Sequence, residues 1–217
     1  MLRLVKSDAV ANSEDPSSRS TGPRDELLPL MEALLRGDVV AKRTFLASVL
    51  PAMLRVVRRV LGSHHPDVED VTQEAAVGLL RALGTFRRDC TVLHFACRIA
   101  VLASLAARRR HRFELSLYDS SEADVFNHTA ADMPGPAENL ASSRRRVILR
   151  ELVDSLPNAQ AEALVLHCVL GHSIDEIGRM TGVPTDTARS RVRLAKDALR
   201  FRVTNDPLLR ELLRDEP

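Results

Sequence analysis

An all-helical protein with two small domains is predicted from three features of the sequence. Apolar residues recur at helical spacing through most of residues 25–112 and again through residues 138–205. Between these stretches, residues 113–137 are acidic, contain a Pro-Gly-Pro sequence and show no apolar period, which is typical of a flexible linker. The chain of 217 residues is long enough for two small cores, and 45% of its residues are hydrophobic.

Charge, cysteine content and the absence of long apolar segments indicate which partners and which cell compartment the sequence favours. The formal net charge is only +2, but Arg and Lys gather in runs at 108–112, 144–146 and 189–202, and such local positive fields favour nucleic acid as a partner. The three cysteines form no CxxC pair, which indicates reduced thiols. No segment approaches the roughly 18 uncharged apolar residues of a membrane span, and the N-terminus lacks the apolar core of a signal peptide. A cytoplasmic protein without membrane insertion is predicted.

The first predicted domain, residues 25–112, follows a disordered N-terminal extension, residues 1–24, which lacks apolar periodicity. Its apolar spacing predicts four helices, from Asp25 to a stop at Gly37, from Val39 to Leu61, from near Pro66 to Ala82, and from Thr91 to Arg112. Pro51 lies inside the second helix and is expected to kink or break it. The fourth helix is apolar on almost every side until its basic end, so it should be buried between the others.

The third helix carries a polar flank beside its buried side. Asp70, Gln73 and Glu74 fall on this flank and are expected to be exposed. Acidic residues in a first turn can complement the helix dipole, which accounts well for Asp67 and Glu69 but poorly for Glu74. The flank is therefore a candidate surface for docking a partner.

The loop from Gly84 to Cys90, GTFRRDC, places an aromatic residue beside two arginines. This combination can stack on an unpaired base and hold its backbone. A plain surface loop is the alternative interpretation.

The fourth helix and the residue before it carry a candidate set of metal ligands. Cys90, His94 and Cys97 fall near one side of it and could donate three metal ligands. No fourth ligand has a recognisable spacing, and cysteine is commonly a small core residue. Neither a metal nor another cofactor is therefore predicted.

The second predicted domain, residues 138–205, begins with a helix from near Glu138 to Leu156 and a second one that ends at Gly171. The apolar spacing of the second helix predicts that Cys168 is buried. After this domain, the tail at 206–217 contains LLRELLR, which could form one or two amphipathic turns.

Residues 171–200 predict a helix, a tight turn and a second, basic helix. Ser173 can cap the first helix, and Glu176 can close a capping box. Gly182 suits the left-handed residue that ends such a helix, and Thr185 can cap the next one. These signals predict a helix-turn-helix.

The second helix of this motif has one narrow apolar stripe and a mostly basic opposite face. The stripe consists of Ala188, Val192, Ala195 and Leu199. Arginine suits a DNA-reading face because its guanidinium can donate two hydrogen bonds to a guanine edge and is attracted to phosphate. A solvated basic helix in an ordinary bundle is the alternative.

Two stretches of the sequence carry a resemblance to a known family. The first, DVEDVTQEAAVGLLRALGTFRRD followed by HFACRIA, is similar to a D-x-x-D-hydrophobic-x-Q-E helix, a promoter-melting loop and an R-I-A helix. The second, from SLPNAQ to GVPTDTARSR, is similar to an L-P-x-x-Q opening, an S-x-x-E-I helix and a G-V-P turn before T-x-R-S-R. Together, in this order, they resemble the bacterial RNA polymerase sigma factors, and in particular the short extracytoplasmic-function (ECF) group of the sigma-70 family.

The resemblance implies a non-catalytic subunit that binds core RNA polymerase, directs it to a subset of promoters and promotes DNA melting. Residues 25–112 would be sigma region 2, and residues 138–205 would be region 4. The implied partners are the β′ coiled coil and β flap of core polymerase, promoter DNA and an anti-sigma factor. No nucleophile-base set or P-loop supports an enzyme. A helix-turn-helix regulator that does not join polymerase, or a sigma-like interaction protein, is the alternative.

The resemblance also assigns roles to individual positions. Binding to core polymerase would involve Asp70, Gln73 and Glu74. Recognition and melting of the minus-ten element would involve Phe86, Arg87, Arg88, Asp89, Cys90, Thr91 and Arg98. Recognition of the minus-thirty-five element would involve Thr185, Asp186, Arg189, Ser190, Arg191 and Arg193, with Arg191 at the DNA backbone. The chain departs from the family at Phe95, Leu102 and Ala106, where Trp, Asn and Asp are common.

Overall fold

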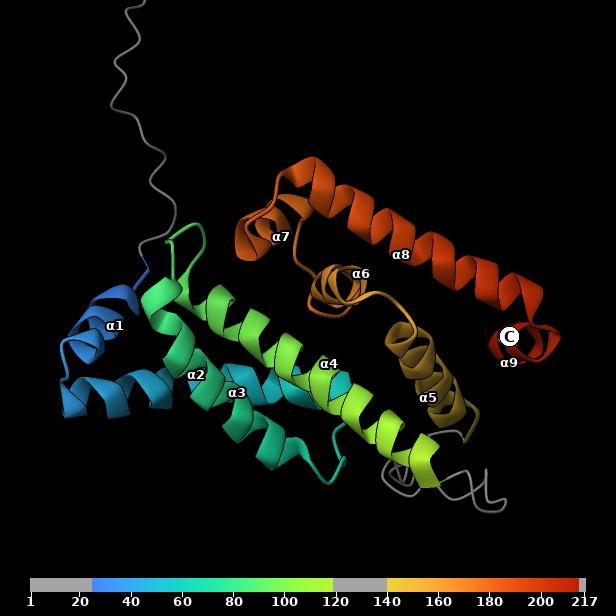
Figure 1. Cartoon of the computed structure of the whole chain (residues 1–217), viewed down its shortest axis with the longest axis horizontal. Coiled ribbons are helices and arrows are strands. Elements are labelled where there is room, and N and C mark those ends of the chain that lie inside the picture. The colour runs from blue at the N-terminus through green and yellow to red at the C-terminus, as the bar shows by residue number, and fades with distance from the viewer. Residues whose placement is uncertain (1–24, 119–139, 215–217) are drawn as a thin grey trace, which may run out of the picture.

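The computed structural model describes residues 25–118 and 140–214, and the regular elements within these ranges are all helices (Figure 1). The α-helices are α1 Leu28–Leu35, α2 Val39–Leu61, α3 Val68–Ala82, α4 Val92–Tyr118, α5 Leu140–Asp154, α6 Asn158–Leu164, α7 Ile174–Thr181, α8 Thr185–Asn205 and α9 Pro207–Arg214. A short 3-10 turn, η1 Leu83–Thr85, follows α3, and a π-helical turn, η2 Val165–Val169, follows α6. The predicted all-helical class is confirmed. The expected N-terminal extension and residues 119–137 of the expected linker lie outside the described residues.

Helices α2, α3 and α4 pack around the N-terminal core, and α1 covers one end of it (Figure 1). Met53, Val57 and Leu79 are fully buried there. Fully burying one such side chain stabilises a fold by about 1.5–3 kcal/mol. Asp25 ties the start of the domain to α4, because its carboxylate accepts a hydrogen bond of 2.6 Å from the backbone N–H of Val92.

Pro51 does not break α2, which was one of the two outcomes expected at this position. The helix runs continuously from Val39 to Leu61. Proline removes the hydrogen bond that the carbonyl of Ala47 would otherwise accept. Both Ala47 and Pro51 are exposed, so water can satisfy this carbonyl. Burial of the opposite side of α2 then keeps the helix intact.

Helix α4 continues past Arg112, where it was expected to end, and reaches Tyr118. The segment after Arg112 contains neither Gly nor Pro until beyond Tyr118, so the sequence offers no residue that would stop the helix. The start of the expected linker is therefore helical.

In the C-terminal domain, α8 packs against α6 and α7, and α9 packs against α8. Leu166 and Ile177 are fully buried in this core. The expected burial of Cys168 is wrong, because its side chain is exposed. Cys168 lies in the π turn η2, and the wider turn rotates the side chains that follow away from the face expected for an α-helix.

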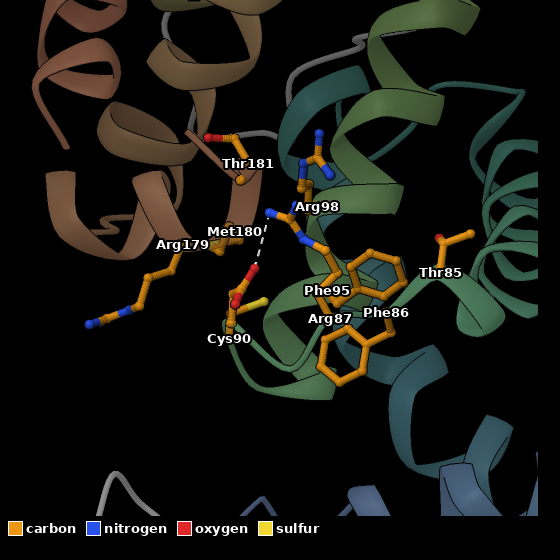
Figure 2. Close-up of a pocket in the computed structure, with 11 residues that line it drawn as sticks. Thr85, Phe86, Arg87, Cys90, Phe95, Arg98, Arg179, Met180 and Thr181 are labelled. Atoms are coloured by element: carbon orange, nitrogen blue, oxygen red, sulfur yellow. Dashed lines mark ion pairs between the residues drawn. The ribbon is translucent and has the colours of Figure 1, made fainter. Parts of the chain in front are cut away.

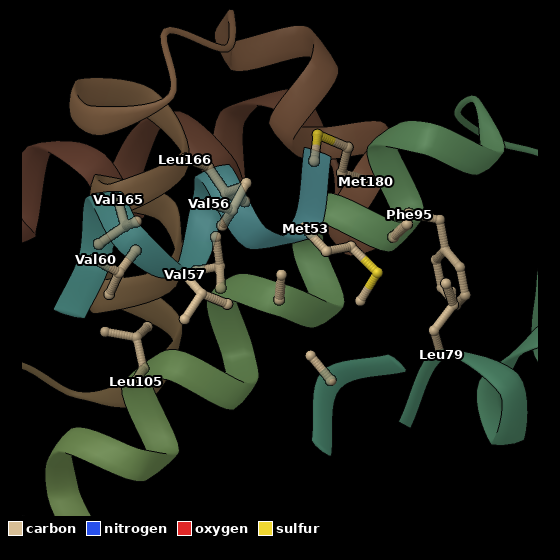
Figure 3. Packing of buried hydrophobic residues seen from close by; sticks show 14 of the residues in the cluster. Met53, Val56, Val57, Val60, Leu79, Phe95, Leu105, Val165, Leu166 and Met180 are labelled. Atoms are coloured by element: carbon tan, nitrogen blue, oxygen red, sulfur yellow. The ribbon is translucent and has the colours of Figure 1, made fainter. Parts of the chain in front are cut away.

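The two domains pack against each other along α4 (Figure 1). Arg98 donates to Glu162 across this contact at 2.6 Å. Arg108 donates two hydrogen bonds to Asp154, of 2.8 and 2.6 Å. Figure 3 shows that Val56 and Val60 of α2 also lie beside Val165 and Leu166. These ion pairs and this apolar contact are called the domain joint below.

No helix within the described ranges is long and apolar enough to cross a membrane.

Candidate nucleic-acid interface

The loop after η1 is held by contacts at both of its sides. Phe86 packs on Phe95 of α4, with ring centroids 5.1 Å apart at a tilt of 48°. Arg88 adopts a left-handed backbone conformation with φ of 64°, which is unfavourable for a residue with a side chain. Its guanidinium donates to Glu32 of α1 at 2.6 Å, so this ion pair helps to fix the unfavourable turn.

A pocket of about 240 Å³ lies between this loop and the turn that ends α7 (Figure 2). It is lined from the N-terminal domain by Thr85, Phe86, Arg87, Asp89, Cys90, Phe95 and Arg98, and from the other domain by residues 179–182. The guanidinium of Arg87 pairs with Asp89 at 3.1 Å, the dashed line in Figure 2. The loop predicted to bind an unpaired base therefore faces the helix-turn-helix.

Glycine suits position 182 for two reasons. Its φ of 69° is the left-handed value that the sequence predicted. A Cβ atom added there would also lie 2.7 Å from Nη2 of Arg87. The turn and the loop are therefore in direct contact, which the sequence did not indicate.

The residues expected at the minus-ten element do not all meet in this pocket. Phe86, Arg87, Asp89, Cys90 and Arg98 line it, and the guanidinium of Arg98 is paired with Glu162 of the domain joint. By contrast, Arg88 bonds to α1, and the hydroxyl of Thr91 accepts a hydrogen bond from the N–H of His94 at the start of α4.

The helix-turn-helix has the cap at the start of α7 that the sequence predicted. The N–H of Ser173 donates to the Glu176 carboxylate at 2.8 Å, and the N–H of Glu176 donates to the Ser173 hydroxyl at 3.3 Å, which confirms the capping box. Gly178 also has a role in the turn that no sequence pattern indicated. A Cβ atom there would lie 3.0 Å from the carbonyl oxygen of Val183, so glycine allows the turn to pass close to α7.

Thr185 does not cap α8, contrary to the prediction. The capping position belongs to Pro184, and Thr185 is the first helical residue. Proline supplies a carbonyl that accepts the first helical hydrogen bond, from the N–H of Ala188 at 3.1 Å. The chain can therefore enter α8 without a side-chain cap, because the fixed φ of Pro184 already directs it there.

The second helix of the motif, α8, presents its polar face to solvent. Ala188, Val192 and Ala195 are at most 4% exposed and pack on the domain core. On the other side Arg189, Ser190 and Arg193 are exposed, together with Asp186. Thr185 and Arg191 are half-buried at the margin of the stripe. Arg189 pairs with Asp186, and such an exposed ion pair is weak enough to exchange for a DNA contact.

The α3 flank, Asp70, Gln73 and Glu74, is exposed, as predicted from the sequence. Glu74 accepts two hydrogen bonds from Arg110 of α4, of 3.1 and 2.7 Å. The hydrogen bond from Arg110 lowers the pKa of Glu74. Arg110 therefore belongs to the same surface, and no spacing in the sequence pairs it with Glu74, because the two residues lie on different helices.

Of the three candidate metal ligands near the start of α4, only His94 lies in a cluster of such groups within the described residues. Burial raises the pKa of Cys90 to about 11 and also raises the pKa of Cys97, so both thiols stay protonated at neutral pH. Instead, His94 lies with His172 and Glu176 of the other domain. Burial is the main cause that lowers the pKa of His172. Hydrogen bonds with Ser173 are the main cause that lowers the pKa of Glu176.

These features define a helical DNA-binding protein with a helix-turn-helix in one domain and an aromatic, arginine-containing loop in the other. Residues 45–114 match the family described as Sigma-70 region 2, and residues 146–199 match Sigma-70, region 4. The chain is 32% identical over 186 residues to the ECF RNA polymerase sigma-E factor of Escherichia coli K12, an alignment that covers 83% of this chain and 95% of that protein. It is 29% identical over 193 residues to the RNA polymerase sigma-H factor of Pseudomonas aeruginosa, with coverage of 86% and 95%.

Among solved structures, the sigma factor RpoE in complex with the anti-sigma factor NepR from Bartonella quintana aligns with a TM-score of 0.47 at 20% identity, over 81% of this chain and 98% of that one. The family matches and the sigma-E relatives show the family of this chain. The chain belongs to the sigma-70 family of RNA polymerase sigma factors, in its ECF group, and directs RNA polymerase to promoters. The resemblance found in the sequence is thus confirmed. Sigma factors are not known as enzymes.

Proposed function

We propose that this sigma factor uses three surfaces during initiation. The α3 flank binds core polymerase, the loop at residues 86–91 holds a flipped base of the minus-ten element, and the exposed face of α8 reads the minus-thirty-five element. The observation that carries this proposal is the orientation of α8. Its stripe is buried in the domain core, so Arg189, Ser190 and Arg193 face solvent and can enter a major groove.

The remaining assignments follow from membership of the family. The α3 flank would bind the β′ coiled coil, and the C-terminal domain, residues 138–205, would contact the β flap. An anti-sigma factor would cover both DNA-facing surfaces and keep the protein inactive. The protein would act in the cytoplasm as a non-catalytic subunit.

Promoter binding requires the domain joint to open. The minus-ten and minus-thirty-five elements are separated by about 25 base pairs, or roughly 85 Å at about 3.4 Å per base pair. In the closed arrangement Arg87 touches Gly182, so the loop and the turn before α8 are in contact. While the loop and the turn are in contact, one straight duplex cannot present the minus-ten element to the loop and the minus-thirty-five element to α8. The joint is therefore closed in the free chain and open on the promoter.

The proposed function is tested by transcription in vitro with core polymerase on a library of genomic promoter fragments. The full-length chain should direct initiation at a subset of fragments that share two elements with constant spacing. Absence of initiation on every fragment, with an active core preparation, would favour a regulator that does not join polymerase.

Arginines on α8 should differ in their effects on promoter sequence preference. Arg189→Ala or Arg193→Ala should cost about 1–3 kcal/mol on the preferred upstream element and relax preference at one or two base pairs. Arg191→Ala should weaken binding to all sequences alike and reduce the salt dependence by about one ion, because its half-buried position favours phosphate. Selection of promoter sequences with holoenzymes that carry each variant measures both effects.

Arg200→Ala is the matched control for the α8 variants. It removes the same exposed side chain from the same helix, more than two turns beyond Arg189. It should leave the selected upstream element unchanged. If all four variants select the wild-type element, α8 does not read bases through this face.

Phe86→Ala should slow formation of the open complex and leave closed-complex affinity nearly unchanged. Stacking on an unpaired base is worth about 1–3 kcal/mol, and it exists only after the base has left the duplex. Permanganate reactivity of promoter thymines reports the open complex, and filter binding at low temperature reports the closed one.

The packing of Phe86 on Phe95 calls for a second variant, Phe86→Leu. Leucine retains much of the apolar volume against Phe95 but lacks the aromatic face. Phe86→Leu should therefore show the same defect in opening as Phe86→Ala. Wild-type opening by Phe86→Leu would mean that Phe86 acts only by packing on Phe95.

A further inference from the structure

Three side chains with candidate metal-ligating groups meet between the two domains, and the proposed function does not use them. His94 lies near the start of α4, and His172 and Glu176 lie at the start of α7. Their candidate ligand atoms are all within 4.8 Å of one another. The two imidazole rings are 4.9 Å apart, and Nδ1 of His172 is 4.0 Å from Oε2 of Glu176. We propose that these three residues bind a zinc-class divalent metal ion that bridges the two domains.

The donor set is suited to this class of ion. Two imidazoles and one carboxylate form a three-residue zinc ligand set that leaves a fourth position for water. Imidazole suits zinc, copper and nickel, whereas calcium and magnesium require mostly oxygen ligands. Tetrahedral ligands at about 2.0–2.1 Å from zinc lie roughly 3.3 Å apart, so the three side chains must move inward by about 1 Å. All three are half-buried at the edge of the joint, which leaves room for this movement.

Neighbouring groups orient the proposed ligands. The N–H and the hydroxyl of Ser173 both donate to Oε2 of Glu176 at 2.8 Å, which holds the carboxylate beside His172. Nδ1 of His167 lies 2.9 Å from the backbone carbonyl oxygen of His172, which fixes the chain just before α7. Such supporting hydrogen bonds hold metal ligands in position in known sites.

Because its ligands come from both domains, a bound metal ion would stabilise the closed arrangement of the two domains. A metal bound only in the closed arrangement shifts the equilibrium towards it, by about 100-fold when free metal exceeds Kd by 100-fold. Zinc would thus oppose the opening that promoter binding requires. This consequence rests on the proposed function, whereas metal binding itself does not.

Calorimetric titration of the full-length chain with Zn²⁺ alone tests the site. We expect one ion per chain and at least tenfold weaker binding in His94→Gln, His172→Gln and Glu176→Gln. Glutamine can replace glutamate in a capping box, so Glu176→Gln removes the carboxylate charge and keeps the cap of α7. His64→Gln is the control, because His64 is an exposed histidine outside the joint, and it should bind zinc as the wild type does.

Substitution with Co²⁺ identifies the ligand atoms. The expected visible spectrum is that of nitrogen and oxygen ligands, without a thiolate charge-transfer band in the near ultraviolet. A thiolate band would assign the ion to the cysteines and overturn the proposal. Zinc affinity unchanged in both His94→Gln and His172→Gln would overturn it as well, provided that circular dichroism shows that both variants are folded.

Hydrogen exchange shows whether the ion bridges the domains. Zn²⁺ should slow amide exchange both in residues 92–99 and in residues 172–178, and His94→Gln should lose the protection in both segments. Protection of residues 172–178 alone would overturn the bridging geometry. None of these measurements contains polymerase or DNA, so their outcome is independent of whether the proposed function is correct.

Discussion

Reversing the charge of the α3 flank should abolish binding to core polymerase. The variant Asp70→Lys with Glu74→Lys places two positive charges on the exposed surface that is proposed to face a basic partner. Like charges across an interface cost several kcal/mol, which corresponds to a loss of affinity of about 100-fold or more. Substitution of Glu74 also releases Arg110 from its ion pair, which adds a further unpaired positive charge. Fluorescence anisotropy of the labelled chain titrated with core polymerase measures the loss.

Two control variants separate this effect from changes in fold or net charge. Glu26→Lys with Glu211→Lys makes the same change in net charge at exposed positions elsewhere and should bind core polymerase normally. Arg110→Ala removes the partner of Glu74 and keeps the acidic flank, so it should not weaken binding. Undiminished binding by the double flank variant, with normal helicity, would show that core polymerase docks on another face.

Arg108→Ala should open the domain joint. The two hydrogen bonds from Arg108 satisfy the carboxylate of Asp154, and the side chains of Arg108 and Asp154 are only 13% and 6% exposed. Removing one partner of a buried ion pair costs about 3–5 kcal/mol while the other charge stays buried. Separation of the domains allows Asp154 to reach water. The loss of stability caused by Arg108→Ala is therefore limited to the free energy that holds the joint closed. Small-angle X-ray scattering should show a larger radius of gyration.

The control for this experiment is again Arg110→Ala. Arg110 lies two residues further along α4, and its ion pair with Glu74 is exposed and lies within one domain. Its loss should leave the radius of gyration unchanged. A lower thermal midpoint of Arg108→Ala without any increase in the radius of gyration would show that the pair stabilises the fold rather than the joint.

The sequence by itself determined the features that depend on residues close together along the chain. The capping box of Ser173 and Glu176 and the left-handed turn at Gly182 are formed by residues a few positions apart. The buried stripe of α8 follows from the helical repeat in the same way. The expected burial of Cys168 is wrong because a π turn changed the outcome of a local rule, and burial of one side of α2 with exposure of the other keeps this helix continuous through Pro51.

Only the tertiary structure decided which distant residues meet. Arg98 pairs with Glu162, 64 residues away, and Arg108 pairs with Asp154, 46 residues away. His94 lies beside His172 although the sequence suggested Cys90 and Cys97 as its neighbours. Helical spacing specifies which side chains share one face of a helix, but it does not specify which other helix packs against that face. The closed joint and its metal-ligating cluster depend on this packing between domains.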